Sequence, residues 1–154
     1  MNDESIIQAD DIVTSSNQIN KLNILPKEGQ PLWESAADDD SPFVEITFSE
    51  TNDEQLDTVQ LIDDENISYV LVEVFDRNGN ELPSNQLVDY RGNEQPATGY
   101  RPDELPAKFG ESVKGVKVKL TFVFTDDTKP VKTKVQIRAC VEPGKKKFFK
   151  IHYI

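Results

Sequence analysis

Two runs of alternating apolar and polar residues constrain the fold of this chain more than any other feature. Every second residue is apolar over residues 116–124, and over residues 131–140 small or branched side chains alternate with lysine, glutamine or arginine. A period of two places neighbouring side chains on opposite faces of a strand, whereas a helix needs a period near 3.6. Turn-forming residues separate the runs, at 125–130. The pattern predicts an antiparallel hairpin with one apolar face and one basic face.

Further strands are expected on both sides of a polar stretch. Residues 43–48, 58–62 and 68–75 are rich in β-branched and aromatic side chains. Residues 81–113 hold seven prolines and glycines and one short strand segment, 86–90. Only residues 5–13 and 102–109 could form short helices. Short strands without alternating helices predict an all-β, antiparallel β-sandwich.

The chain length fits a single domain. Of its 154 residues, the first 18 are mostly polar, and we expect them to form a flexible N-terminal arm or a loosely docked first strand. Residues 19–154 are then one β-sandwich domain. The last seven residues, 148–154, are a further strand segment that follows three lysines.

The charge of the chain limits its partners. Lys plus Arg total 17 and Asp plus Glu total 28, which gives a net charge of −11. Such a surface repels nucleic acid and anionic membranes unless its basic residues cluster. No stretch approaches the ~18 apolar residues of a membrane span. The N-terminus lacks the basic and apolar regions of a signal peptide, so we expect a segment of a longer secreted chain, with a cytosolic protein as the alternative.

Catalytic chemistry is poorly represented. Cys140 is the one cysteine, so no internal disulfide can form, and His152 is the one histidine. Two such residues are too few for a zinc site, and no nucleophile elbow, phosphate loop or dinucleotide fingerprint occurs. We therefore predict that the chain is not an enzyme. A polysaccharide-cleaving sandwich that uses two carboxylates is the weakest of our three hypotheses.

Acidic loops suggest a calcium ion. Calcium takes six to eight oxygen ligands from carboxylates and loop carbonyls. Neither of the two clusters that we single out has the spacing of an EF-hand, and solvated loops are the alternative. The predicted ligands are Asp38, Asp39 and Asp40 in one loop and Asp63 and Asp64 in another.

Loop aromatics and arginines suggest a carbohydrate site. Such sites combine an aromatic ring with amides, acids and arginines, although aromatic residues of a sandwich also fill its core. The side chains of this type flank the polar stretch and could converge. The predicted ligand contacts are Trp33, Tyr90, Arg91, Tyr100 and Arg101.

Two further surface features follow from the strand pattern. The triplet Asn66-Ile67-Ser68 is an N-glycosylation acceptor. A row of basic residues would share the outer face of the final hairpin, where it could meet sulfated glycans or an acidic partner, or guard the sheet against unwanted pairing. The row consists of Lys117, Lys119, Lys132, Lys134 and Arg138.

The order of these segments resembles discoidin-like, galactose-binding-type domains. The resemblance rests on residues 43–48 and 56–61, on Val-Glu-Val-Phe-Asp at 72–76, and on the closing strand 135–140 that ends in Cys140. It covers residues 20–142 and implies an eight-stranded jelly-roll-like sandwich that binds ligands with loops at one end, in some members with a structural calcium. The chain departs from the family in lacking an early cysteine and in its tail.

The resemblance and the residues lead to one functional hypothesis and one alternative. We expect a non-catalytic, extracellular module for adhesion or carbohydrate binding, whose partner is a glycan or a protein. The alternative is a structural interaction domain of a large adhesive, mucin-like or fibrous protein, without a small ligand and with self-association. Such modules recur in secreted mucin-like and adhesive proteins of the family that the chain resembles.

Overall fold

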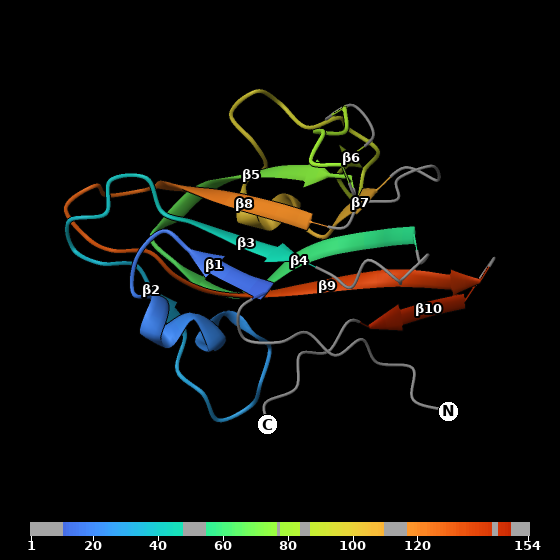
Figure 1. The fold of residues 1–154 in the computed structure, drawn as a ribbon. Helices are drawn as coiled ribbons and strands as arrows, with labels where there is room; N and C mark the ends of the chain where they lie inside the picture. The colour runs from blue at the N-terminus through green and yellow to red at the C-terminus, as the bar shows by residue number, and fades with distance from the viewer. Residues whose placement is uncertain are drawn as a thin grey trace.

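Two antiparallel sheets face each other in the structure, a computed structural model that describes residues 11–47, 55–76, 78–83, 87–109, 117–142 and 145–148 (Figure 1). The strands are β1 (Ile12–Thr14), β2 (Trp33–Glu34), β3 (Phe43–Thr47), β4 (Gln55–Glu65), β5 (Ile67–Phe75), β6 (Leu87–Val88), β7 (Ala107–Phe109), β8 (Lys117–Phe124), β9 (Lys132–Glu142) and β10 (Lys145–Phe148). Two short 3₁₀ helices are η2 (Gln18–Ile24) and η4 (Pro102–Glu104). The first sheet has the order β1-β3-β8-β5, and the second has the order β10-β9-β4-β7-β6, with β2 also paired to β9. The predicted all-β antiparallel sandwich is confirmed.

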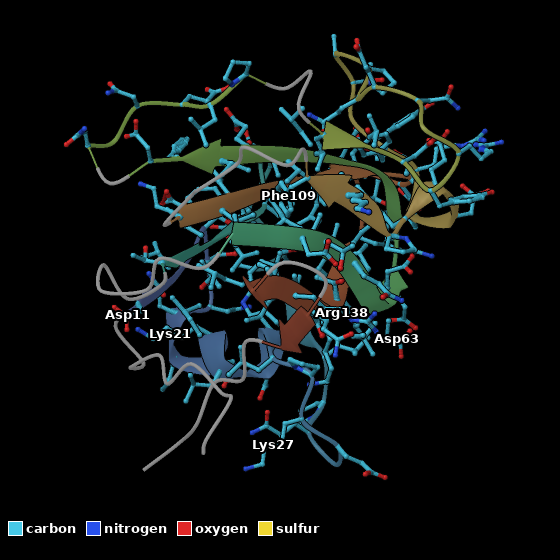
Figure 2. The ribbon with its side chains drawn as sticks, turned by 90° about the vertical axis from the view of Figure 1, so that its right-hand side faces the viewer. Asp11, Lys21, Lys27, Asp63, Phe109 and Arg138 are labelled. Carbon is cyan, nitrogen blue, oxygen red and sulfur yellow. The ribbon has the colours of Figure 1, made fainter. Side chains whose placement is uncertain are left out.

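The core lies between the sheets, where the apolar residues of the alternating strands meet (Figure 2). On β8 the side chains of Val118, Leu120 and Phe122 are buried, and their neighbours Lys117 and Lys119 point to the other face. Burial of the apolar set removes hydrocarbon surface from water, which is the main favourable contribution to folding. The period of two therefore places each strand with its apolar face toward the opposite sheet.

The last two long strands do not form a hairpin. β8 pairs with β3 and β5, whereas β9 pairs with β4 in the other sheet. Residues 125–131 therefore carry the chain across the sandwich, and the predicted hairpin is wrong. Two strands that lie in opposite sheets bury their apolar faces just as the two strands of a hairpin do. The same alternation of side chains therefore fits both arrangements and cannot distinguish them. β4 and β5, separated by Asn66 alone, also lie in opposite sheets.

The predicted basic face is divided by this crossing. Lys134 is buried and its Nζ donates to the carbonyl oxygens of Asn23 and Leu25, both at 2.9 Å. Burial lowers the pKa of its ammonium group. Lys132 lies between Glu34 and Glu65, each with an N–O distance of 3.6 Å. The five residues lie on two strands of different sheets: Lys117 and Lys119 on β8, and Lys132, Lys134 and Arg138 on β9.

The N-terminal segment belongs in part to the sandwich. β1 pairs with β3, and the side chains of Ile12 and Thr14 are buried. The sheet therefore includes residues 12–14 of the segment for which we expected a flexible arm or a loosely docked first strand, because Ile12 is part of the core. Residues 1–10 of that arm and residues 149–154 of the predicted last strand lie outside the described residues. Of the two short helices expected, residues 102–104 form η4, while residues 107–109 form β7 instead.

Asn66 ties the two crossings together. Its backbone is left-handed, with φ 65°. Its Nδ2 donates to the carbonyl oxygens of Asp126 and Lys129, both at 2.8 Å, and of Pro130 at 3.2 Å, and its Oδ1 accepts from the Asp126 amide at 2.8 Å. Nδ2 is the atom to which an N-linked glycan would be attached. In the structure the Asn66 side chain of this triplet is bonded to the 125–131 loop, and a glycan at Nδ2 would displace these hydrogen bonds.

Candidate functional site

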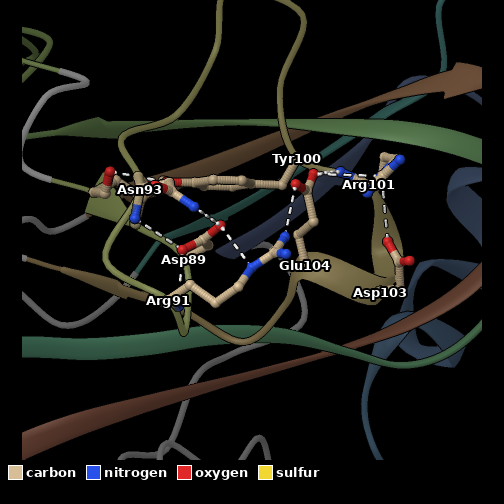
Figure 3. Close-up of polar contacts among 8 residues, drawn as sticks. Asp89, Arg91, Asn93, Tyr100, Arg101, Asp103 and Glu104 are labelled. Carbon is tan, nitrogen blue, oxygen red and sulfur yellow. Dashed lines mark hydrogen bonds and ion pairs between the residues drawn. The ribbon is translucent and has the colours of Figure 1, made fainter.

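The loop after β6 is folded around a buried aspartate. The Oδ1 atom of Asp89 accepts hydrogen bonds from the backbone amides of Arg91 and Asn93, both at 2.8 Å (Figure 3). Its Oδ2 atom accepts from Asn93 Nδ2 at 3.3 Å. The hydrogen bond from the Asn93 backbone has the largest effect on the pKa of Asp89, and together these bonds hold that pKa below its usual value. Burial acts in the opposite direction. The buried carboxyl group of Asp89 thus closes the loop over residues 90–92.

Tyr100 supports this loop from below. Its ring is buried, with 1% of the residue exposed, and its hydroxyl lies 2.9 Å from the carbonyl oxygen of Leu87 and 3.0 Å from that of Asn93. Its backbone pairs with Val70 of β5 through two hydrogen bonds. Burial raises the pKa of the Tyr100 hydroxyl, which stays protonated and can donate. Tyr100 thus connects the loop to both sheets.

An exposed aromatic ring and two arginines form the outer surface of the loop. Tyr90 is 61% exposed, and Cζ of Arg91 lies 5.1 Å from the centroid of its ring. Arg91 is held in turn by Glu104, with an Nη2–Oε2 distance of 3.3 Å (Figure 3). Nearby, Nε of Arg101 lies 3.4 Å from Asp103 Oδ1. The surface combines an exposed tyrosine, one ring face of which contacts Arg91, with hydrogen-bond donors and acceptors, which suits a ligand with C–H faces and hydroxyl groups.

The structure brings four of the five predicted contact residues together and separates the fifth. Tyr90, Arg91 and Arg101 lie at the loop surface, and Tyr100 lies beneath them. The buried ring of Tyr100 has no free face, so its role is support rather than contact. The prediction for Trp33 needs the same correction, because this residue is fully buried on β2 and its ring centroid lies 6.4 Å from that of Phe122. A core position, rather than a ligand platform, is the role that the fold gives to Trp33.

Sequence reasoning did not single out the acids that hold the arginines. Asp89 and Glu104 determine where Arg91 lies. The sequence did contain an indication for Asp89, which begins a turn that includes Gly92-Asn93. The side chain of an aspartate in this position commonly accepts hydrogen bonds from backbone amides a few residues further on. Glu104 could be found from its place three residues after Arg101, with Pro102 between them at the start of a short helix.

The predicted calcium ligands do not assemble. Asp39 accepts hydrogen bonds from the hydroxyl groups of Ser15 and Ser16. Burial raises the pKa of Asp64, and the nearby charge of Asp63 raises it further. Within the described part of the chain, which includes Asp38, Asp39, Asp40, Asp63 and Asp64, no three acidic, histidine or cysteine side chains are placed to hold a metal ion.

Two further observations bear on the predictions about membranes and catalysis. No helix in the described ranges is long and apolar enough to cross a membrane. Cys140 lies in β9, and His152 lies outside the described residues.

Comparison with known proteins defines the fold. No family of known sequences matches this chain, and no curated protein matches it either. Among solved structures, the fold is similar to "CpGH89CBM32-6 produced by Clostridium perfringens", with 16% sequence identity and a TM-score of 0.52 over 87% of this chain and 98% of that chain. The designation of that protein marks it as a carbohydrate-binding module of a glycoside hydrolase. The chain therefore has the β-sandwich fold that this module also has.

Proposed function

We propose that this chain is a non-catalytic module that binds glycans through the loop surface around Tyr90. One observation carries the proposal: the Tyr90 ring is 61% exposed, although the loop that presents it is anchored by the buried side chains of Asp89 and Tyr100. An exposed aromatic ring on a rigid support is typical of a binding surface, because the contact gains area at little cost in conformational entropy. The shared fold with a carbohydrate-binding module supports the same function.

The chemistry of the loop suits a saccharide. The C–H face of a sugar ring would stack on Tyr90, and its hydroxyl groups would pair with the guanidinium groups of Arg91 and Arg101. Arg91 is already oriented by Glu104 at 3.3 Å and by Asp89 at 3.8 Å, so binding would not have to order it. With a net charge of −11 and the basic residues divided between the sheets, we expect neutral glycans to bind better than sulfated ones. An extracellular setting, as a segment of a longer chain, is part of the proposal.

The test is a glycan array followed by titration calorimetry with the best ligand. Tyr90→Ala is expected to weaken binding at least tenfold, because it removes the stacking surface. The matched control is Ile62→Ala on β4, where 45% of an apolar residue is also exposed, and its affinity should stay within twofold of wild type. Full affinity of Tyr90→Ala, or an array without any bound glycan, would refute the proposal. Titration with and without a chelator tests the calcium prediction separately.

A specific observation also favours the alternative of an interaction domain. Ile19 in η2 is 93% exposed, and the nearby strand residue Val13 is 39% exposed, so two apolar side chains face solvent near the N-terminal end of the described chain. If this surface mediates self-association, Ile19→Ser should lower the weight-average mass measured by sedimentation at high concentration, with Ile62→Ser as the control. Wild-type protein that stays monomeric up to millimolar concentration would contradict the alternative.

A further inference from the structure

A cavity of about 350 Å³ opens at the side of the sandwich, between the edge strand β5 and the loop that follows it. This volume falls within the range of small-ligand sites. The floor is made by buried core residues of both sheets, and the wall by exposed or half-buried residues of the loop. Floor and wall include Val72, Val74, Leu87, Phe109, Leu82 and Pro96.

The cavity is held open by polar contacts along the edge of β5. The side-chain amide of Gln95 pairs with the backbone of Val72, accepting from its N–H at 2.9 Å and donating to its carbonyl oxygen at 3.1 Å. The Leu82 amide donates to the carbonyl oxygen of Val74 at 2.8 Å. A side chain thus takes the place of a neighbouring strand, and the loop cannot collapse onto the floor without breaking these bonds. The shape of the cavity is therefore part of the fold.

Two acidic residues, Glu73 and Glu81, are among those that line this cavity. Glu73 projects from β5, and Glu81 lies on the segment that forms a bridge with Phe75. Burial raises the pKa of Glu73, and Glu81 raises it further by its charge and by a hydrogen bond. The other charged groups that face Glu73 are Lys119, which lowers this pKa, and Glu45, which raises it. Nζ of Lys119 lies 4.6 Å from the ring centroid of Phe43, and Glu45 is paired with Lys117 at 3.4 Å.

We propose that this cavity binds an alkylammonium group, with its aliphatic stem on the apolar floor and its ammonium between Glu73 and Glu81. An ammonium group offers three hydrogen-bond donors and a positive charge, so it could pair with both carboxyl groups at once. An anion would be repelled by the two carboxyl groups, and a neutral alcohol would bring no charge to oppose theirs. The ammonium could belong to a free amine or to a lysine side chain of a protein. The site is independent of the Tyr90 surface and of glycan binding.

The first test is an NMR titration of the full chain with primary n-alkylamines of two to six carbons. Affinity should rise about fourfold with each CH₂ until the stem fills the floor, and n-butanol should bind at least tenfold more weakly than n-butylamine. Affinity should also rise with pH above 4.5, because the pKa of Glu73 is raised and the amine must displace its proton. Equal binding of alcohol and amine, or no dependence on stem length, would overturn the proposal.

Substitutions then assign the carboxyl groups. Glu73→Gln with Glu81→Gln should weaken n-butylamine binding at least tenfold and abolish its pH dependence. The control, Glu28→Gln with Asp127→Asn, changes the net charge equally at exposed positions outside the cavity and should leave affinity within twofold. Unchanged affinity in the first double variant would refute the site. Comparison of 1,5-diaminopentane with an acetylated, amidated lysine identifies the source of the ammonium group. Tighter binding of the diamine indicates a small-molecule ligand, and tighter binding of the blocked lysine indicates a protein side chain.

Discussion

Asn66→Ala is expected to lower the free energy of unfolding by about 3 kcal/mol. Four side-chain hydrogen bonds would be lost, which join the β4–β5 crossing to residues 126–130 of the β8–β9 crossing. Alanine would also be strained at the left-handed φ of 65°. Both crossings carry the chain between the sheets, so the loss of these hydrogen bonds affects the alignment of the two sheets. Urea denaturation followed by tryptophan fluorescence, with Trp33 buried in the core, measures this change.

Two variants separate the causes of this effect. Asn17 is also left-handed, with φ 50°, but its side chain donates to a single carbonyl oxygen, that of Glu34 at 2.7 Å. Asn17→Ala should therefore cost about 2 kcal/mol, about 1 from the strain and about 1 from the single hydrogen bond. Asn66→Gly removes the strain but not the loss of hydrogen bonds, and it should still cost about 2 kcal/mol. Equal effects of Asn66→Ala and Asn17→Ala would show that the crossings do not depend on this side chain.

Gly99→Ala is expected to cost about 4 kcal/mol of stability and to abolish glycan binding in the same variant. A Cβ atom at this position would lie 2.4 Å from the carbonyl oxygen of Val70 and 2.6 Å from its carbonyl carbon. These are backbone atoms of the edge strand β5, so the loop would have to move away from this strand. That movement would break the paired hydrogen bonds between Val70 and Tyr100, and with them the support of the Tyr90 surface.

Gly29→Ala is the matched control for this variant. Gly29 has φ +86° against +96° for Gly99, but no atom lies within 4 Å of a Cβ atom placed on it. The cost of an L-residue at positive φ, about 1 kcal/mol, is then measured without the clash. Thermal unfolding and calorimetry with the array ligand report both effects. Gly29→Ala should keep its glycan affinity. If Gly99→Ala proved as stable as Gly29→Ala, the close contact with Val70 could not be the cause of the predicted loss of stability.

The alternation of side chains was sufficient to predict the strands and the class of fold. Residues 116–124, 131–140 and 68–75 repeat with a period of two, and among their described residues the same face of each strand is buried. The buried side chains include Val118, Leu120 and Phe122, Val131, Val135 and Ile137, and Val70, Val72 and Val74. This outcome depends on the local geometry of a strand, since successive side chains must point to opposite faces. The types of residue in the polar stretch also indicated a surface with Tyr90, Arg91 and Arg101.

The partners of these elements were decided by tertiary structure. An apolar face can be buried in either sheet, so the alternation could not tell that β8 and β9 lie in opposite layers. For the same reason nothing local distinguished Trp33 and Tyr100, which are buried, from Tyr90, which is exposed. The cavity beside Glu73 joins groups more than twenty residues apart through the Gln95 amide. The sequence by itself determined which faces are apolar, because that property is local. Only the fold decided which faces meet, because that choice depends on contacts between distant segments.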